Sequence, residues 1–140
     1  KIELESILIH DYQKDQKRWS ARGKAAFLSE NPKQILIQDV QVVVFDLEQP
    51  NDVVMVTIVA KEGLIDWESS QILLQHQVRI QQRNEIELIT EKMVYAYDRG
   101  IIKIEDEVEL RKNEAKITGR ELELNIEQQT LLMKQVDFSY

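Results

Sequence analysis

ILIQDVQVVV, residues 35–44, carries the strongest structural signal in the chain. Its β-branched residues, with apolar positions at Val40 and Val42 separated by a polar one, are typical of a strand with one buried face. The same spacing occurs three more times: an apolar residue, three residues, Val, and another apolar residue two positions later. The four copies are Leu36, Val40 and Val42; Leu74, Val78 and Ile80; Ile104, Val108 and Leu110; and Leu132, Val136 and Phe138.

A second landmark lies upstream of each copy and repeats at nearly the same distance. It pairs an apolar residue with a small one two positions later: Trp19 and Ala21, Ile58 and Ala60, Leu88 and Thr90, Ile117 and Gly119. The steps from Ala21 are 39, 30 and 29 residues, and those from Val40 are 38, 30 and 28. Because two landmarks agree to within one residue, the chain consists of repeats, and such short units bury an apolar face only by stacking.

Stacking places equivalent positions in rows. We predict that Trp19, Ile58, Leu88 and Ile117 face inward as one row, and that Ile65, Tyr95 and Leu124 form another. The strongest helical competitor is Gln71 to Arg83, but its apolar residues keep even spacing and predict two strands with a bend. The fold class is therefore all-β, a long antiparallel sheet folded into an open, V-shaped β-jellyroll of about 12–16 short strands. We expect residues 1–140 to form a single domain.

Composition argues against several classes of function. Lys and Arg total 18 against 25 Asp and Glu, a net charge of −7, so nucleic-acid binding is not expected. There is no Cys, and no apolar run is long enough to span a membrane. His10 and His76 are too isolated for a metal site, and the acidic run 105–109 reads as a solvated strand face. No phosphate-binding loop or nucleophile elbow is present, so neither enzyme activity nor a cofactor is expected.

Several stretches resemble the periplasmic domains of the LptC family of the lipopolysaccharide export machinery. The resemblance begins at Trp19-Ser20-Ala21-Arg22 and 35–44, continues through 59–80, 88–110 and 117–138, and covers nearly the whole chain, from about Ile2 to Tyr140. The LptA family has the same repeat, often with Gly midway between the apolar residue and Val. Here those positions hold Gln38, His76, Asp106 and Lys134, which favours LptC.

The resemblance implies a periplasmic domain that transports lipopolysaccharide. It implies receipt from the inner-membrane ABC transporter at the N-terminal edge and transfer through an apolar groove to LptA at the C-terminal edge. It also implies native anchoring in the inner membrane by an N-terminal helix that this chain lacks. The candidate groove residues are Trp19, Ala21, Val40, Val42, Val56, Ile58, Ala60, Val78, Ile80, Leu88, Val108, Leu110, Ile117, Gly119, Val136 and Phe138. The candidate partner edge is Gln135, Val136, Asp137, Phe138, Ser139 and Tyr140.

Alternatives stay open at this point. The chain could be an LptA-like soluble bridge, or a scaffold that joins partners through sheet edges around a filled interior. Gly119 marks either a bulge or a close approach, and Trp19 and Trp67 are either core anchors or groove-rim residues. The basic residues near the first repeat are either solvated or meet lipid phosphates; they are Arg18, Arg22 and Lys24.

Overall fold

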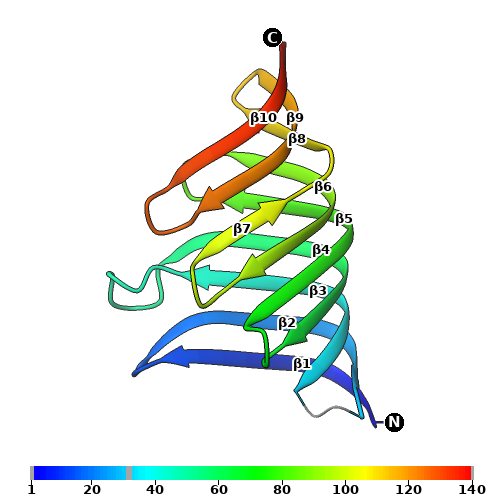
Figure 1. Cartoon of the computed structure of the whole chain (residues 1–140). Coiled ribbons are helices and arrows are strands. Elements are labelled where there is room, and N and C mark those ends of the chain that lie inside the picture. Colours follow the sequence, from blue (N-terminus) through cyan, green and yellow to red (C-terminus); the bar gives the residue numbers. More distant parts are fainter. Residues whose placement is uncertain (1, 31–32, 140) are drawn as a thin grey trace.

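The computed structural model describes residues 2–30 and 33–139, and ten strands in these residues form one antiparallel sheet. The strands follow chain order from β1 to β10, except that β7 and β8 both lie between β6 and β9. They stack from β1 at the N-terminal end of the molecule to β10 at the C-terminal end (Figure 1). Their bounds are β1 Ile2–Gln13, β2 Gln16–Leu28, β3 Gln34–Phe45, β4 Val54–Asp66, β5 Gln71–Gln82, β6 Glu87–Ala96, β7 Ile101–Ile104, β8 Val108–Lys112, β9 Ala115–Asn125 and β10 Thr130–Ser139.

Most of the long strands bend near their middle, and the sheet folds over on itself along these bends (Figure 1). Several bends are marked by non-glycine residues with positive φ: Ser6, Asp39, His76, Gln77, Glu121 and Gln135. We call the two half-sheets arm A and arm B. Arm A contains 40–45 of β3, 54–60 of β4, 78–82 of β5, all of β8, and the halves of β1, β2, β6, β9 and β10 that align with them. Arm B contains the other halves of these strands and β7. The inner faces of both arms contribute to one apolar cluster.

The bend expected in Gln71 to Arg83 is confirmed, because the register of β5 shifts between Gln75 and Val78. The expected count of short strands is too high, since a bent strand pairs with the same neighbour on both sides of the bend and stays a single strand. Only around Asp106 is a strand interrupted, which separates β7 from β8. The positions midway in each repeat thus lie at or beside a bend or break in a strand, and at His76 the φ of 69° is a left-handed conformation that favours glycine.

The predicted rows can be followed through the strand pairing. In arm A one row runs Ile9, Ala21, Val42, Ile58, Ile80, Leu88, Leu110, Ile117 and Phe138. In arm B the predicted row of Ile65, Tyr95 and Leu124 is confirmed, with Ile72 and Ile102 between its members.

Trp19 is the exception to the predicted row. It pairs with Val44 in the neighbouring row, so Ala21 takes the predicted place of Trp19 and this landmark of the first repeat is shifted by two residues. Because side chains alternate with a period of two, the shift leaves Trp19 facing inward. The inward direction is confirmed: Trp19, Ile58 and Leu88 are fully buried, and Ile117 is half-buried against the core.

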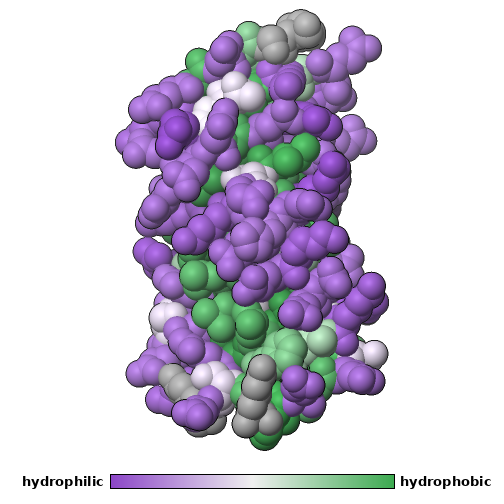
Figure 2. Space-filling view, turned by 90° about the vertical axis from the view of Figure 1, so that its right-hand side faces the viewer, coloured by the Kyte–Doolittle hydropathy of each residue, from purple (hydrophilic) through white to green (hydrophobic). Residues whose placement is uncertain are grey.

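Burial is not uniform along the stack. Inward residues of the central strands are almost fully buried, whereas those of β1 and β10 are half-buried, as are Ile9 and Leu131, or exposed, as are Ile2 at 53% and Phe138 at 52%. Apolar surface gathers at the end of the molecule where β1 lies (Figure 2). No helix long and apolar enough to cross a membrane is found in residues 2–30 and 33–139.

Candidate functional site

The structure brings the predicted groove residues together on the inner faces of the two arms. Ile117 is half-buried, and Val136 and Phe138 are each 52% exposed. All the others are buried. Side chains therefore fill the interior across the central strands, and the apolar rows open only at the ends of the stack.

Gly119 is packed by its own chain. A Cβ atom placed there would lie 2.7 Å from Cγ of Met133 and 2.9 Å from the backbone oxygen of Lys134. The register of β10 is irregular opposite this glycine. The absent side chain thus lets Met133 cross closely over β9, so the close approach is internal.

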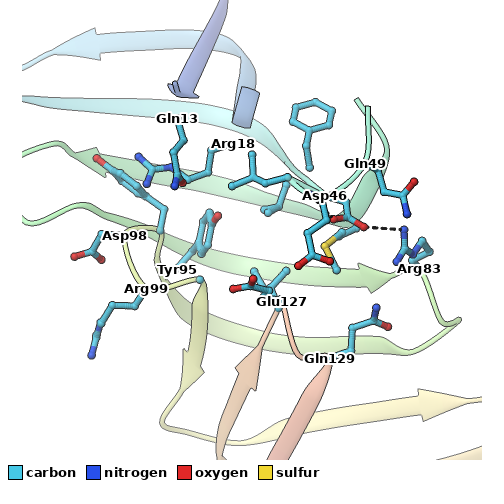
Figure 3. A pocket seen from close by; sticks show the side chains of 18 residues that line it. Gln13, Arg18, Asp46, Gln49, Arg83, Tyr95, Asp98, Arg99, Glu127 and Gln129 are labelled. Atoms are coloured by element: carbon cyan, nitrogen blue, oxygen red, sulfur yellow. Dashed lines mark hydrogen bonds and ion pairs between the residues drawn. The ribbon is translucent and has the colours of Figure 1, made fainter. Parts of the chain in front are cut away.

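The two arms meet at a polar cavity of about 480 Å³ along their free margin, which we call the mouth (Figure 3). Arm A contributes Arg18, Val44, Arg83 and the loop after β3, and arm B contributes Tyr95, Tyr97 and the turns after β6 and β9. The labelled side chains around it are Gln13, Arg18, Asp46, Gln49, Arg83, Tyr95, Asp98, Arg99, Glu127 and Gln129. The mouth is the place where a polar surface borders the apolar interior.

Arg18 reaches the mouth because of a bulge. Asp11 pairs with Trp19 and Tyr12 pairs with Lys17, so Arg18 is the extra residue on β2. Its Nε donates a hydrogen bond to Asp11 at 2.7 Å, and its guanidinium carbon lies 4.8 Å from the centre of the Tyr97 ring. Of the three basic residues considered near the first repeat, only Arg18 lines this cavity. Arg22 and Lys24 are exposed and line a separate hollow beside β1.

The tyrosines of the mouth were not singled out by the sequence, although Tyr95 was placed in the correct row. Burial raises the pKa of the Tyr95 and Tyr97 phenols, so both stay neutral around neutral pH. The backbone N–H of Tyr97 donates to the backbone oxygen of Ser70 at 3.1 Å, and the Tyr97 ring centre lies 5.4 Å from that of Trp19. Tyr97 therefore joins arm B to arm A through Trp19 and Arg18, a contact that alternation alone does not reveal.

Trp19 is a core residue, whereas Trp67 is 37% exposed on the turn after β4. The Nε1 atom of Trp19 is buried and has no hydrogen-bond acceptor within the part of the chain that the structure describes. A buried donor without an acceptor is unusual in native proteins.

The two outer strands leave open sheet edges. Among the described residues β10 pairs only with β9, and β1 pairs only with β2. The candidate partner edge 135–139 lies in β10, and Tyr140 lies outside the described residues. Such edges carry backbone groups available for strand addition.

The histidines have local partners. His10 bonds to Ser20 at 2.6 Å, and His76 bonds to Glu91 at 2.8 Å. Across the described ranges, no group of three or more His, Asp or Glu side chains is arranged to hold a metal ion.

Comparisons with known proteins agree with this geometry. The family model described as "LptC: Lipopolysaccharide-assembly, LptC-related" matches residues 39–140. A crystal structure of LptH from Pseudomonas aeruginosa, described as the LptA-homologous periplasmic component of the lipopolysaccharide transport device, has a similar fold, with a TM-score of 0.66. The alignment covers 87% of this chain and 94% of LptH at 9% identity, so it shows the fold alone. Curated proteins yield no match.

Proposed function

The chain belongs to the LptC-related family of lipopolysaccharide-assembly proteins, and from this membership we propose that its apolar interior carries the acyl chains of lipopolysaccharide. As a family member it is a component of lipopolysaccharide transport. We infer that residues 1–140 form one periplasmic domain, and native anchoring by an N-terminal membrane helix belongs to the same proposal.

The continuous inner row from Ile9 to Phe138 is the observation that carries the proposal. It extends through the whole stack, and its central members are buried while its C-terminal member is half exposed. Each Å² of hydrocarbon removed from water contributes about 25 cal/mol, so an acyl chain needs little more than this apolar area. Because side chains fill the centre, the arms must part at the mouth before a chain can enter.

We further propose a direction of transfer. The ABC transporter of the inner membrane would join at β1 and deliver lipid there, and LptA would join at β10 and receive it. Within the described residues β1 pairs only with β2 and β10 only with β9, and an inward apolar residue lies on each of these outer strands, Leu4 on β1 and Val136 on β10. A partner sheet that pairs with such an edge prolongs the apolar row into its own interior.

Site-specific photo-crosslinking to lipopolysaccharide tests the lipid pathway. Inward positions Val42, Ile80 and Leu110 are expected to crosslink. Their outward neighbours Val43, Arg79 and Glu109 serve as matched controls. Equal labelling of both faces would contradict an interior pathway. Absence of lipid at the inward positions would favour the second candidate function, a scaffold around a filled core. The near-complete burial of the central inward residues is the observation that supports this candidate.

A proline substitution tests the C-terminal edge. Val136→Pro removes one backbone donor and stiffens β10, so it is expected to weaken LptA binding at least tenfold while circular dichroism stays unchanged. Gln16→Pro, at the start of β2 and far from β10, is the control. Undiminished LptA binding by folded Val136→Pro would move the contact to another surface.

A further inference from the structure

Apolar packing explains the buried ring of Trp19 but not the presence of its N–H group. The side chain is fully buried, and Nε1 has no acceptor in residues 2–30 or 33–139. Leaving a buried donor unpaired costs more stability than an ordinary hydrogen bond gives. Phe would fill a similar apolar site without this cost. The donor is therefore a candidate for a partner that is not part of the folded chain.

Trp19 lies at a chemical boundary. Val44, its partner across the sheet, lines the polar mouth, and so does Tyr97, whose ring packs on the indole. On the other side, Trp19 belongs to the apolar cluster that fills the interior. The Trp19 N–H lies between the polar mouth and the apolar interior. An amphipathic ligand in this position would place the junction of its polar head and its hydrocarbon chains near this donor.

The Tyr97 ring packs on Trp19 and is held in place by non-covalent contacts. The Tyr97 ring is held by its contacts with the rings of Trp19 and Tyr95 and by the guanidinium of Arg18. None of these is covalent, and each joins side chains at the margin of the arms. Tyr97 contacts the indole and also lines the cavity, and it lies beyond the last residue of β6, so its ring can move without breaking strand pairing.

We propose that Trp19 Nε1 donates a hydrogen bond to an acyl carbonyl oxygen of the transported lipid once the Tyr97 ring has moved aside. Acyl chains of a glycolipid are joined to their sugars through ester or amide carbonyls, which are acceptors at the junction of head and hydrocarbon. The carbonyl satisfies the buried donor and fixes how deeply the chain enters. This inference rests on the proposed function, since it concerns the same lipid.

Removing the N–H while keeping an aromatic ring is the direct test. Binding of purified lipopolysaccharide is measured for the unchanged protein, for Trp19→Phe and for Trp67→Phe. Loss of one neutral hydrogen bond is expected to weaken binding about threefold to tenfold in Trp19→Phe. Its melting temperature is measured as well, because the void left by the smaller ring lowers stability while the removal of an unpaired buried donor raises it. Trp67→Phe should change neither quantity.

A spectroscopic measurement keeps the test valid if Trp19→Phe fails to fold. In Trp67→Phe the only tryptophan is Trp19, and ultraviolet resonance Raman detects hydrogen bonding of its indole N–H. The band should shift towards the hydrogen-bonded position when lipopolysaccharide is added. Equal affinity of Trp19→Phe and the unchanged protein, or a band that does not move, would overturn the role of Trp19 and leave the proposed function standing. Failure of the unchanged protein to bind lipopolysaccharide would overturn both.

Discussion

Ile58 and Phe138 belong to the same inward row, yet Ile58 is fully buried and Phe138 is 52% exposed. The difference lies in their neighbours. Strand β4 is paired on both sides, whereas β10 is paired only with β9 in the described part of the chain. Alternation sets the direction of a side chain, and position in the stack sets its burial. The central strands therefore make a stable filled core, and the outer strands offer the same apolar chemistry to partners.

The largest contrast is expected from a charge placed in each region. Val78→Glu puts a carboxylate into the fully buried centre and should lower the free energy of unfolding by roughly 3 kcal/mol or more. Phe138→Glu at the open end should lower it by less than about 1 kcal/mol. Urea titration measures both. Similar losses for the two variants would mean that β10 is as enclosed as β5.

A glycine substitution tests how firmly the last strand is attached. In Gly119→Ala the new methyl group would collide with the backbone oxygen of Lys134, so β10 must shift and stability should fall by about 1–3 kcal/mol. Gly63→Ala in the centre meets only a Val40 methyl group at 3.1 Å and should cost less. Thermal unfolding of both variants checks this order, and the reverse order would refute the tight crossing of Met133.

Glycine at the bend of β5 should raise the free energy of unfolding, whereas glycine elsewhere in that strand should lower it. Gln77 has a φ of 55°, which costs an L residue about 1 kcal/mol or more. Gln77→Gly should therefore stabilise the domain by about 0.5 kcal/mol after the entropy of glycine is subtracted. Gln75→Gly, with an ordinary backbone, should destabilise it by about 0.5–1 kcal/mol. A loss of stability in both variants, seen in urea titration, would mean that the bend is not strained.

The smallest effect concerns a turn at the tip of arm B. Gln34 donates to the Asp66 carboxylate at 3.1 Å, and the backbone N–H groups of Glu68 and Ser69 donate to it as well. These bonds hold the pKa of Asp66 below its usual value. Their contribution is complete above the pKa of the unfolded state and is lost as pH falls through the lower folded pKa. Asp66→Asn should thus be less stable at pH 6 and converge with the unchanged protein in strong acid; a constant difference would exclude this linkage.

The structural features that depend on local periodicity could be predicted from the sequence. The strands, the bend near His76 and the inward direction of Ile58 and Leu88 follow from even spacing and from the repeat. The register of Trp19 did not, because it is set by the pairing of β2 with β3, which puts Trp19 opposite Val44, and the repeat pattern does not report that pairing. The contact of Trp19 with Tyr97 was equally hidden, since it exists only when the two arms fold together.

The exposure of the ends also escaped prediction. The repeat pattern of Val136 and Phe138 is the same as that of Val78 and Ile80, so sequence alone gives them the same burial. Only the absence of a further strand beyond β10 in the described residues distinguishes them. In a stacked array the burial of a residue depends on whether its strand has a neighbour on both sides, and the local sequence pattern does not contain this information.

Lipid can enter the filled interior only if the two arms part at the mouth. Gln49 and Gln129 are exposed and lie at the mouth on arm A and arm B (Figure 3). Spin labels on cysteines at these two positions report the distance between the arms by double electron–electron resonance. Saturating lipopolysaccharide is expected to lengthen this distance by several ångströms, whereas the distance within a second pair on arm A, at Gln49 and Arg79, is expected not to change. An unchanged distance across the mouth in protein with bound lipopolysaccharide would contradict entry of the lipid between the arms.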